Sequence, residues 1–128
     1  MKKAFLFFAV CLFNTGSALA SDNEFSKDYK RCLDQAVSTY DITECAQQEL
    51  EKQDARLNSV YKKLRAVESE NQKKKLLEAQ RAWIKFRDTW GDYLNDPEGG
   101  TLVRVMTITW TLEATVDQAI RLEQRFLE

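Results

Sequence analysis

Apolar residues recur at intervals of three and four along most of the chain, which is the spacing that places them on one face of an α-helix. The first such stretch is residues 26–37, and it begins at Ser26, a residue type that caps helix N-termini. Residues 38–41 interrupt the pattern. We expect a second helix to follow, with Asp41 or Thr43 as its cap.

The second helix has an apolar stripe that continues to Val67. Its apolar positions are Leu50, Leu57, Val60, Tyr61, Leu64 and Val67. A polar stretch, residues 68–75, follows without Gly or Pro. Because so short a chain must fold back to bury this stripe, we place a turn near Glu70 and Asn71.

Residues 95–100 separate the third and fourth helices, since they hold the only Pro of the chain and a Gly pair. The apolar positions of the third helix include Leu76, Ala79, Trp83, Phe86, Trp90 and Tyr93. The fourth helix spans residues 101–127, although the β-branched residues within 107–111 locally favour a strand. No second segment could pair with such a strand. The sequence therefore predicts an all-α protein, a small helical bundle of one short and three long helices.

The first 20 residues have the pattern of a cleaved signal peptide. Lysines at positions 2 and 3 are followed by the apolar run Ala4–Phe13 and by the small-x-small cleavage signal at 18–20. The apolar run is short for a membrane span. We therefore expect residues 1–20 to be removed. Residues 21–128 would then form one domain without a membrane segment, located in the periplasm or secreted.

A lipid anchor at Cys11 is the alternative for this segment. It requires a small residue directly before the cysteine, and Val10 stands there. Cleavage at Cys11 would also shorten the apolar run and leave the signal at residues 18–20 without a role. We favour the form without a lipid anchor.

Removal of residues 1–20 leaves two cysteines, Cys32 and Cys45. In an exported chain such a pair predicts a disulfide. The bond would close a loop of 14 residues, which is worth about 3 kcal/mol in the chain-entropy model. A redox-active pair is a weaker alternative, because these cysteines do not form a Cys-x-x-Cys motif. Two cysteines without His also do not make an ordinary zinc site, so we expect no metal.

The chain has no His, which excludes Ser-His and Cys-His nucleophile pairs and a His general base. The formal charge is −1, and it becomes −3 when residues 1–20 and their two lysines are removed. A chain without an excess of basic residues is not expected to bind nucleic acid. Carboxylates are abundant, but they lie on polar helix faces, and no spacing isolates a catalytic pair. We expect neither enzymatic activity nor a cofactor.

Two features of the third helix could bind a ligand. The aromatic stripe of Trp83, Phe86, Trp90 and Tyr93 could form a binding surface, but its helical spacing favours a place in the core. The three lysines at 73–75 could contact a phosphate or an anionic membrane. A solvated helix end is the simpler interpretation of these lysines.

The segment Ala79–Asp88, AQRAWIKFRD, mixes apolar and polar residues in a specific order. Further residues along the chain belong to the same pattern. They are Thr39, Cys45, Ala46, Asp54, Leu57, Asn58, Tyr61, Leu64, Gly99, Gly100, Thr115 and Leu122. Together they resemble the LprI-like lysozyme-inhibitor domain, a small exported helical module of bacteria. The resemblance runs from Cys32 to about Leu122. It implies a protein that inhibits lysozyme by binding it.

A module that binds another envelope protein or a secreted protein, with no enzyme as its target, is the alternative function. In either case the partner is a protein. The sequence does not indicate an oligomeric state.

The chain departs from the resembled family at a second cysteine pair, whose positions are occupied by Trp90 and Trp110. Because a disulfide needs Cα atoms within about 7 Å, the resemblance implies that these two tryptophans are neighbours packed in the core. Gln118 stands where the family often has Arg, which weakens any role for a charge there.

The motif residues Asn58, Gln80, Arg87 and Asp88 lie on or beside the apolar stripes. We expect them to form a buried or half-buried hydrogen-bond network that fixes the helix register, with Arg87 paired to Asp54 or another acid. The complete set assigned to this structural motif is Asp54, Asn58, Tyr61, Gln80, Trp83, Arg87, Asp88, Trp90 and Trp110.

An inhibitor could act by placing a loop in the groove of lysozyme, an enzyme that cleaves glycans with two carboxylates. The candidate is the acidic loop 95–100, which we expect to be exposed and mobile. An ordinary turn between antiparallel helices is the alternative. The residues assigned to partner binding are Asp96, Pro97, Glu98, Gly99 and Gly100.

Overall fold

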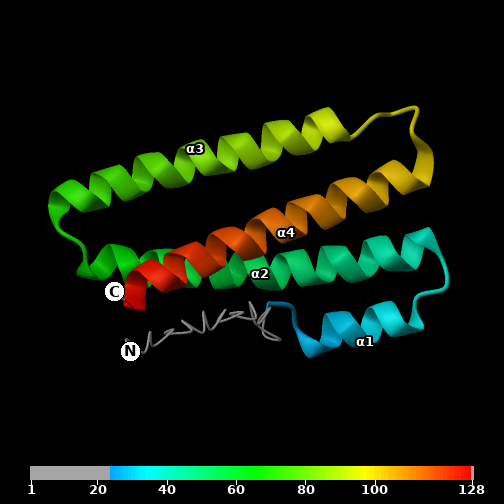
Figure 1. Ribbon diagram of the computed structural model, residues 1–128, viewed down its shortest axis with the longest axis horizontal. Coiled ribbons are helices and arrows are strands. Elements are labelled where there is room, and N and C mark those ends of the chain that lie inside the picture. Colours follow the sequence, from blue (N-terminus) through cyan, green and yellow to red (C-terminus); the bar gives the residue numbers. More distant parts are fainter. Residues whose placement is uncertain (1–23, 128) are drawn as a thin grey trace, which may run out of the picture.

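The computed structural model describes residues 24–127, which form four α-helices and no strand (Figure 1). These are α1 (Lys27–Gln35), α2 (Thr39–Val67), α3 (Glu70–Leu94) and α4 (Gly100–Leu127). The prediction of an all-α protein with one short and three long helices is confirmed. The expected signal peptide and Cys11 lie outside the described residues.

A serine caps the N-terminus of each of the first three helices. Ser38 caps α2: its Oγ accepts from the amide of Asp41 at 3.1 Å, and the Asp41 carboxylate accepts from the amide of Ser38 at 3.0 Å. The predicted cap, Asp41 or Thr43, is therefore wrong, because Asp41 is the third residue of the helix and the partner of Ser38 in a capping box. Hydrogen bonds from Ser38 and from the amide of Val37 lower the pKa of Asp41 below its ordinary value.

The turn between α2 and α3 also lies earlier than Glu70 and Asn71. α2 ends at Val67, and Ser69 caps α3 by accepting from the amide of Gln72 at 3.3 Å. A serine hydroxyl provides the start signal that Gly or Pro would otherwise supply. The turn expected near Glu70 and Asn71 is present, but it lies at residues 68–69 and both Glu70 and Asn71 are already helical.

The β-branched segment 107–111 is helical, as predicted. Thr111 donates its hydroxyl to the carbonyl of Thr107 at 2.9 Å, and Thr115 donates to the carbonyl of Thr111 at 2.8 Å. These bonds satisfy the hydroxyls of Thr111 and Thr115 within the helix itself. Burial of Leu112 and Val116 against α2 outweighs the local preference for a strand.

The core lies between α2 and α4, which run side by side in the same direction and make the largest interface (Figure 1). It has two clusters. In the first, α1 joins them, and the buried residues are Tyr29, Cys45, Ala46, Leu50, Leu112 and Val116. In the second, Leu76 and Trp83 of α3 pack against buried Leu57, Val60, Leu64, Ala119 and Leu122. Each cluster is thus closed by a different third helix.

This division leaves the second half of α3 outside the core. Gln80 is the only buried residue of α3, and Phe86, Trp90 and Tyr93 have exposed fractions of 56%, 42% and 75%. The prediction that the aromatic stripe belongs to the core is wrong for these three residues, whereas Trp83 packs against the second cluster as expected. Helical spacing places the rings on one face of α3, but this face lies on the outer side of the bundle, where Phe86 and Trp90 contact Trp110 of α4 and remain exposed.

A disulfide and a buried carboxylate are among the features that attach α1 to α2. The predicted disulfide joins Cys32 to Cys45 and is confirmed. Glu49, only 1% exposed, accepts from the amide of Ser26 at 2.8 Å, from the Ser26 hydroxyl at 2.5 Å and from Gln53 Nε2 at 2.7 Å. A buried carboxylate is stable only with such partners. The residue that caps α1 is therefore tied to the middle of α2.

The arrangement has two distinct ends (Figure 1). The α1–α2 turn and the α3–α4 loop lie together at one end, which we call the loop end. The α2–α3 connection and the C-terminal part of α4 lie at the other, which we call the elbow end. No described helix combines the length and the apolar character needed to cross a membrane.

Replacement of both Cys32 and Cys45 by Ser should lower the free energy of unfolding by about 3 kcal/mol, because the unfolded chain loses a closed loop. Urea denaturation of the oxidised protein and of the double variant measures this difference. Reductant should destabilise the wild type and leave the double variant unchanged. Equal midpoints for wild type and variant would show that the disulfide does not hold α1.

Candidate protein-binding site

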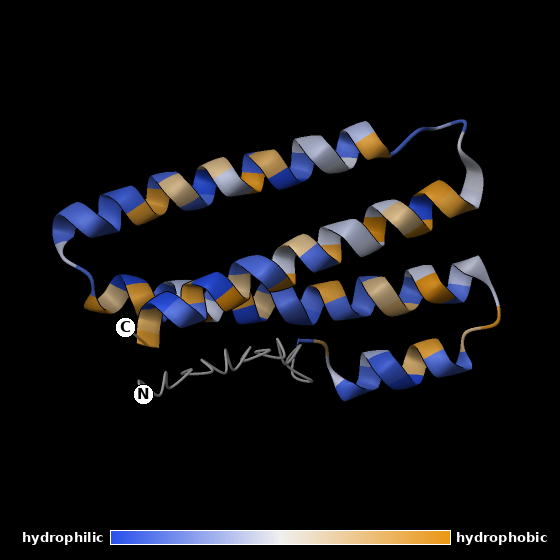
Figure 2. Ribbon diagram, viewed as in Figure 1, coloured by the Kyte–Doolittle hydropathy of each residue, from blue (hydrophilic) through white to orange (hydrophobic). Residues whose placement is uncertain are grey.

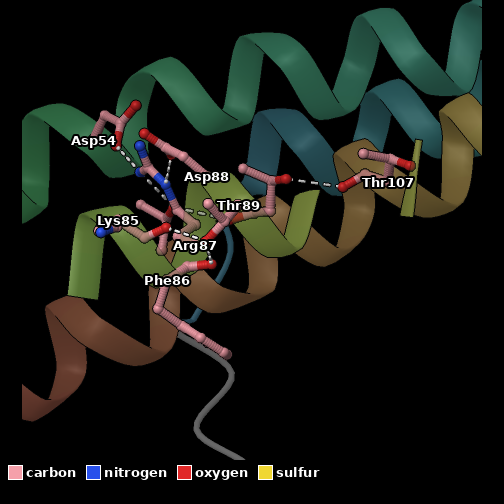
Figure 3. A network of polar contacts seen from close by, with 9 residues as sticks. Asp54, Lys85, Phe86, Arg87, Asp88, Thr89 and Thr107 are labelled. Carbon is pink, nitrogen blue, oxygen red and sulfur yellow. Dashed lines mark hydrogen bonds and ion pairs between the residues drawn. The ribbon is translucent and has the colours of Figure 1, made fainter. Parts of the chain in front are cut away.

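Arg87 of α3 lies at the centre of a polar network that joins three helices (Figure 3). Its Nη1 donates to Asp54 Oδ1 of α2 at 3.1 Å and to Thr115 Oγ1 of α4 at 3.3 Å. Its Nε donates to Asp88 at 3.0 Å, and its guanidinium lies 5.0 Å from the ring centre of Trp83. The expected pairing of Arg87 with Asp54 is present. One side chain thus sets the position of α3 against both α2 and α4.

A second polar contact fixes α3 two turns earlier. Gln118 Nε2 of α4 donates to Gln80 Oε1 at 3.0 Å, and Gln80 is buried. Gln118 was not expected as a partner of Gln80, because the resemblance indicates only that Gln118 replaces a family Arg. The available signal was the spacing: Gln80 and Arg87 are seven residues apart on one face of α3.

Two motif residues do not join this network. Asn58 is exposed and makes no hydrogen bond within the described part of the chain, so its expected place in a buried network was wrong. Tyr61 is half-buried, and its hydroxyl has no partner among the described residues. Both lie nearer the elbow end than Asp54 does, beside the first turns of α3. The network therefore includes only some of the residues assigned to the structural motif.

Four aromatic side chains form a continuous group on the outer side of α3 and α4, which we call the aromatic face: Phe86, Trp90, Tyr93 and Trp110. Ring centres are 6.3 Å apart for Phe86 and Trp90, 6.1 Å for Phe86 and Trp110, 6.3 Å for Trp90 and Trp110, and 5.2 Å for Trp90 and Tyr93. The expected proximity of Trp90 and Trp110 is confirmed, but Trp90 is partly exposed, so the pair is not buried.

Different sides of α3 contribute to the network and to the aromatic face. In Figure 3 the Phe86 side chain points away from Asp54, whereas Arg87 points toward it. Consecutive helical residues differ in direction by about 100°. Arg87 therefore holds α3 in place, whereas its neighbour Phe86 remains available to a partner.

The aromatic face continues toward the loop end, where other large apolar side chains are exposed. These are Leu102 and Met106 in the first turns of α4, and Val37 and Tyr40 near the start of α2. Thr39 and Tyr40 line the same hollow as Thr101 and Arg104, which confirms that the starts of α2 and α4 are adjacent. A concentration of exposed apolar groups of this kind is typical of a protein-binding surface.

The α3–α4 loop forms a hydrogen-bonded turn. Asp96 Oδ1 accepts from the amide of Glu98 at 2.9 Å, and the Asp96 carbonyl accepts from the amide of Gly99 at 3.0 Å. Gly100 has a φ of 68°, a conformation that L side chains rarely adopt. Asp96, Pro97 and Glu98 are exposed, as expected, and the loop is strongly hydrophilic (Figure 2). It presents two carboxylates beside the apolar surface.

Within residues 24–127, no three His, Cys, Asp or Glu side chains come together as ligands of a metal ion would. The arrangement that stands out is instead an exposed aromatic face beside an acidic loop, on a helix fixed by Arg87. The chemistry available there is non-covalent recognition.

Comparison with known proteins agrees with this picture. The family model described as "Lysozyme inhibitor LprI" matches residues 32–124, which include the disulfide, the Arg87 network, the aromatic face and the loop. No curated protein and no solved structure matches the chain.

Arg87→Ala should lower the free energy of unfolding by about 2–3 kcal/mol, because it removes charge-assisted hydrogen bonds and leaves Asp54 without its partner. Urea denaturation measures the change. Arg81→Ala, an exposed site on the same helix, is the matched control and should change stability by less than about 0.5 kcal/mol. Equal stability of the two variants would contradict the positioning role of Arg87.

Proposed function

Because the chain belongs to the LprI family, we propose that it is an exported, non-enzymatic protein that binds lysozyme and inhibits it. The observation that carries this proposal is the exposed aromatic face beside the acidic loop 95–100. Export to the periplasm or beyond is proposed from the signal-peptide pattern of residues 1–20, and a disulfide is in keeping with an oxidising compartment.

The aromatic face has the composition of an interface centre. Trp and Tyr are the residue types that most often dominate binding energy, because they bury a large area with few rotatable bonds. Here each ring is braced by a neighbouring ring, so less side-chain freedom is lost on binding. The network around Arg87 fixes the helix that carries three of the four rings.

Charge supports a basic partner. Asp92, Asp96 and Glu98 are exposed near the α3–α4 loop, and animal-type lysozymes are basic proteins. Opposite charges steer association and accelerate encounter, and salt weakens the effect. The net charge of −3 for residues 21–128 adds a modest attraction in the same direction.

In the proposed mechanism the loop enters the substrate groove of lysozyme and the aromatic face covers the groove's rim. Asp96, Pro97 and Glu98 form the tip, and Tyr93 and Leu102 flank it. A glycan chain cannot occupy the groove while the tip lies in it. Inhibition then requires no chemistry from this protein, only occupancy.

The purified protein should slow lysis of a cell-wall suspension by lysozyme in proportion to its concentration. Trp90→Ala/Tyr93→Ala should weaken inhibition at least about tenfold, because two central aromatic contacts are lost. Val67→Ala, an exposed apolar site at the elbow end, is the control and should inhibit like the wild type. No inhibition by the wild type at large molar excess would favour a module that binds another protein.

The loop is tested separately by Asp96→Asn/Glu98→Gln. This variant should associate with lysozyme more slowly and depend less on salt, because it lacks two steering charges. The control Glu51→Gln/Glu78→Gln makes the same charge change at exposed positions on α2 and α3, away from the loop. If both variants inhibit equally well, the loop carboxylates have no part in the mechanism.

A further inference from the structure

The elbow end is basic, in contrast to the loop end. The segment 61–75 contains only two acidic residues, Glu68 and Glu70. Its six basic residues are Lys62, Lys63, Arg65, Lys73, Lys74 and Lys75. This local excess of four positive charges occurs in a chain whose formal charge is −1. At about 1.5 Å per residue, α3 separates the two ends by roughly 37 Å, so they act as independent surfaces.

Part of this basic segment surrounds a hollow of about 640 Å³ between the end of α2 and the start of α3. Lys62, Arg65 and Lys73 contribute to its lining, together with Tyr61 and Glu70. Lys73 pairs with Glu70 at 2.8 Å. Lys62 and Arg65 make no hydrogen bond or ion pair within residues 24–127, and the buried Tyr61 hydroxyl also lacks a partner there. The hollow thus offers unused donors and a positive field.

The basic side chains around the hollow also act on Glu70. The hydrogen bond and charge of Lys73, with a smaller contribution from Arg65, hold the pKa of Glu70 below its ordinary value. The lining holds three positive charges and one carboxylate, so Glu70 does not neutralise them. An anion with several acceptor oxygens, such as a phosphate group, is the chemical class that matches three cationic side chains around one hollow.

The other basic residues at this end, and the apolar residues exposed there, indicate a ligand larger than a single phosphate group. Lys63, Lys74 and Lys75 lie outside the lining of the hollow, so a small soluble anion in it would leave them unused. Large apolar residues are also exposed at this end. Val67 is the last residue of α2, and Phe126 and Leu127 are the last two residues of α4. Basic side chains mixed with exposed apolar ones are typical of surfaces that lie on anionic membranes.

We propose that the elbow end docks this protein on an anionic phospholipid surface, with a headgroup phosphate held among Lys62, Arg65 and Lys73. Contact of this end with the lipid leaves the aromatic face and the loop directed away from the membrane, where a protein partner can reach them. The inference rests on the charge and hollow of the elbow end and does not depend on lysozyme binding.

Sedimentation with vesicles tests the proposal. The purified protein should bind vesicles of equal parts phosphatidylglycerol and phosphatidylcholine, and it should not bind phosphatidylcholine alone. Binding should weaken steadily with added NaCl, because these charges are exposed to solvent. Absence of binding to the anionic vesicles, or equal binding to both kinds, would overturn the proposal.

The variant Lys62→Gln/Arg65→Gln/Lys73→Gln should bind the anionic vesicles about 100-fold more weakly, since each basic residue contributes about fivefold near an anionic surface. Arg81→Gln/Lys85→Gln/Arg104→Gln removes three exposed charges away from the hollow and is the matched control. It should retain binding. Circular dichroism confirms that both variants are folded, and equal binding by the two would contradict the assigned site.

Inorganic phosphate and tripolyphosphate distinguish a lipid headgroup from a soluble anion. The proposal expects weak binding of either anion and much stronger binding to vesicles. Val67→Ser/Phe126→Ser should reduce vesicle binding and leave anion binding unchanged, because only the membrane contacts apolar groups. Binding of the soluble anions without binding to vesicles would assign a soluble phosphate ligand and overturn the membrane proposal.

Discussion

The position of α3 depends on the guanidinium of Arg87, which bonds to Asp54 of α2 and Thr115 of α4 and lies over the ring of Trp83. α3 buries little else, since Gln80 is its only buried residue. A helix with so few apolar contacts is held in register by polar partners that are costly to leave unpaired. The contact of Gln80 with Gln118 acts in the same way two turns earlier.

This mode of attachment explains why large rings remain in contact with solvent. α2 and α4 provide one long interface, and two different helices complete it: α1 covers one part and the first half of α3 covers the other. The disulfide and the buried Glu49 hold α1 in its place. The aromatic residues in the second half of α3 belong to neither core cluster, and they become a surface that a partner can bind.

Sequence periodicity predicts which residues share a helix face, but it does not predict whether another helix covers that face. The helices, the Cys32–Cys45 bond and the pairing of Arg87 with Asp54 therefore followed from local patterns and residue chemistry. The exposure of Trp90 did not, because it depends on which side of α3 faces α2 and α4 in the folded protein. The start of α2 was misplaced because Asp41 has the residue type of a cap but acts as the partner of Ser38.

The aromatic face and the basic elbow together describe a protein with separate surfaces for separate partners, of which the aromatic face is central to the account. Hydrogen–deuterium exchange with and without an animal-type lysozyme tests it most directly. The account predicts slower exchange in residues 86–106 on complex formation, with little change in residues 61–75. Slower exchange confined to residues 61–75 or to α1, or inhibition without any change in residues 86–106, would contradict it.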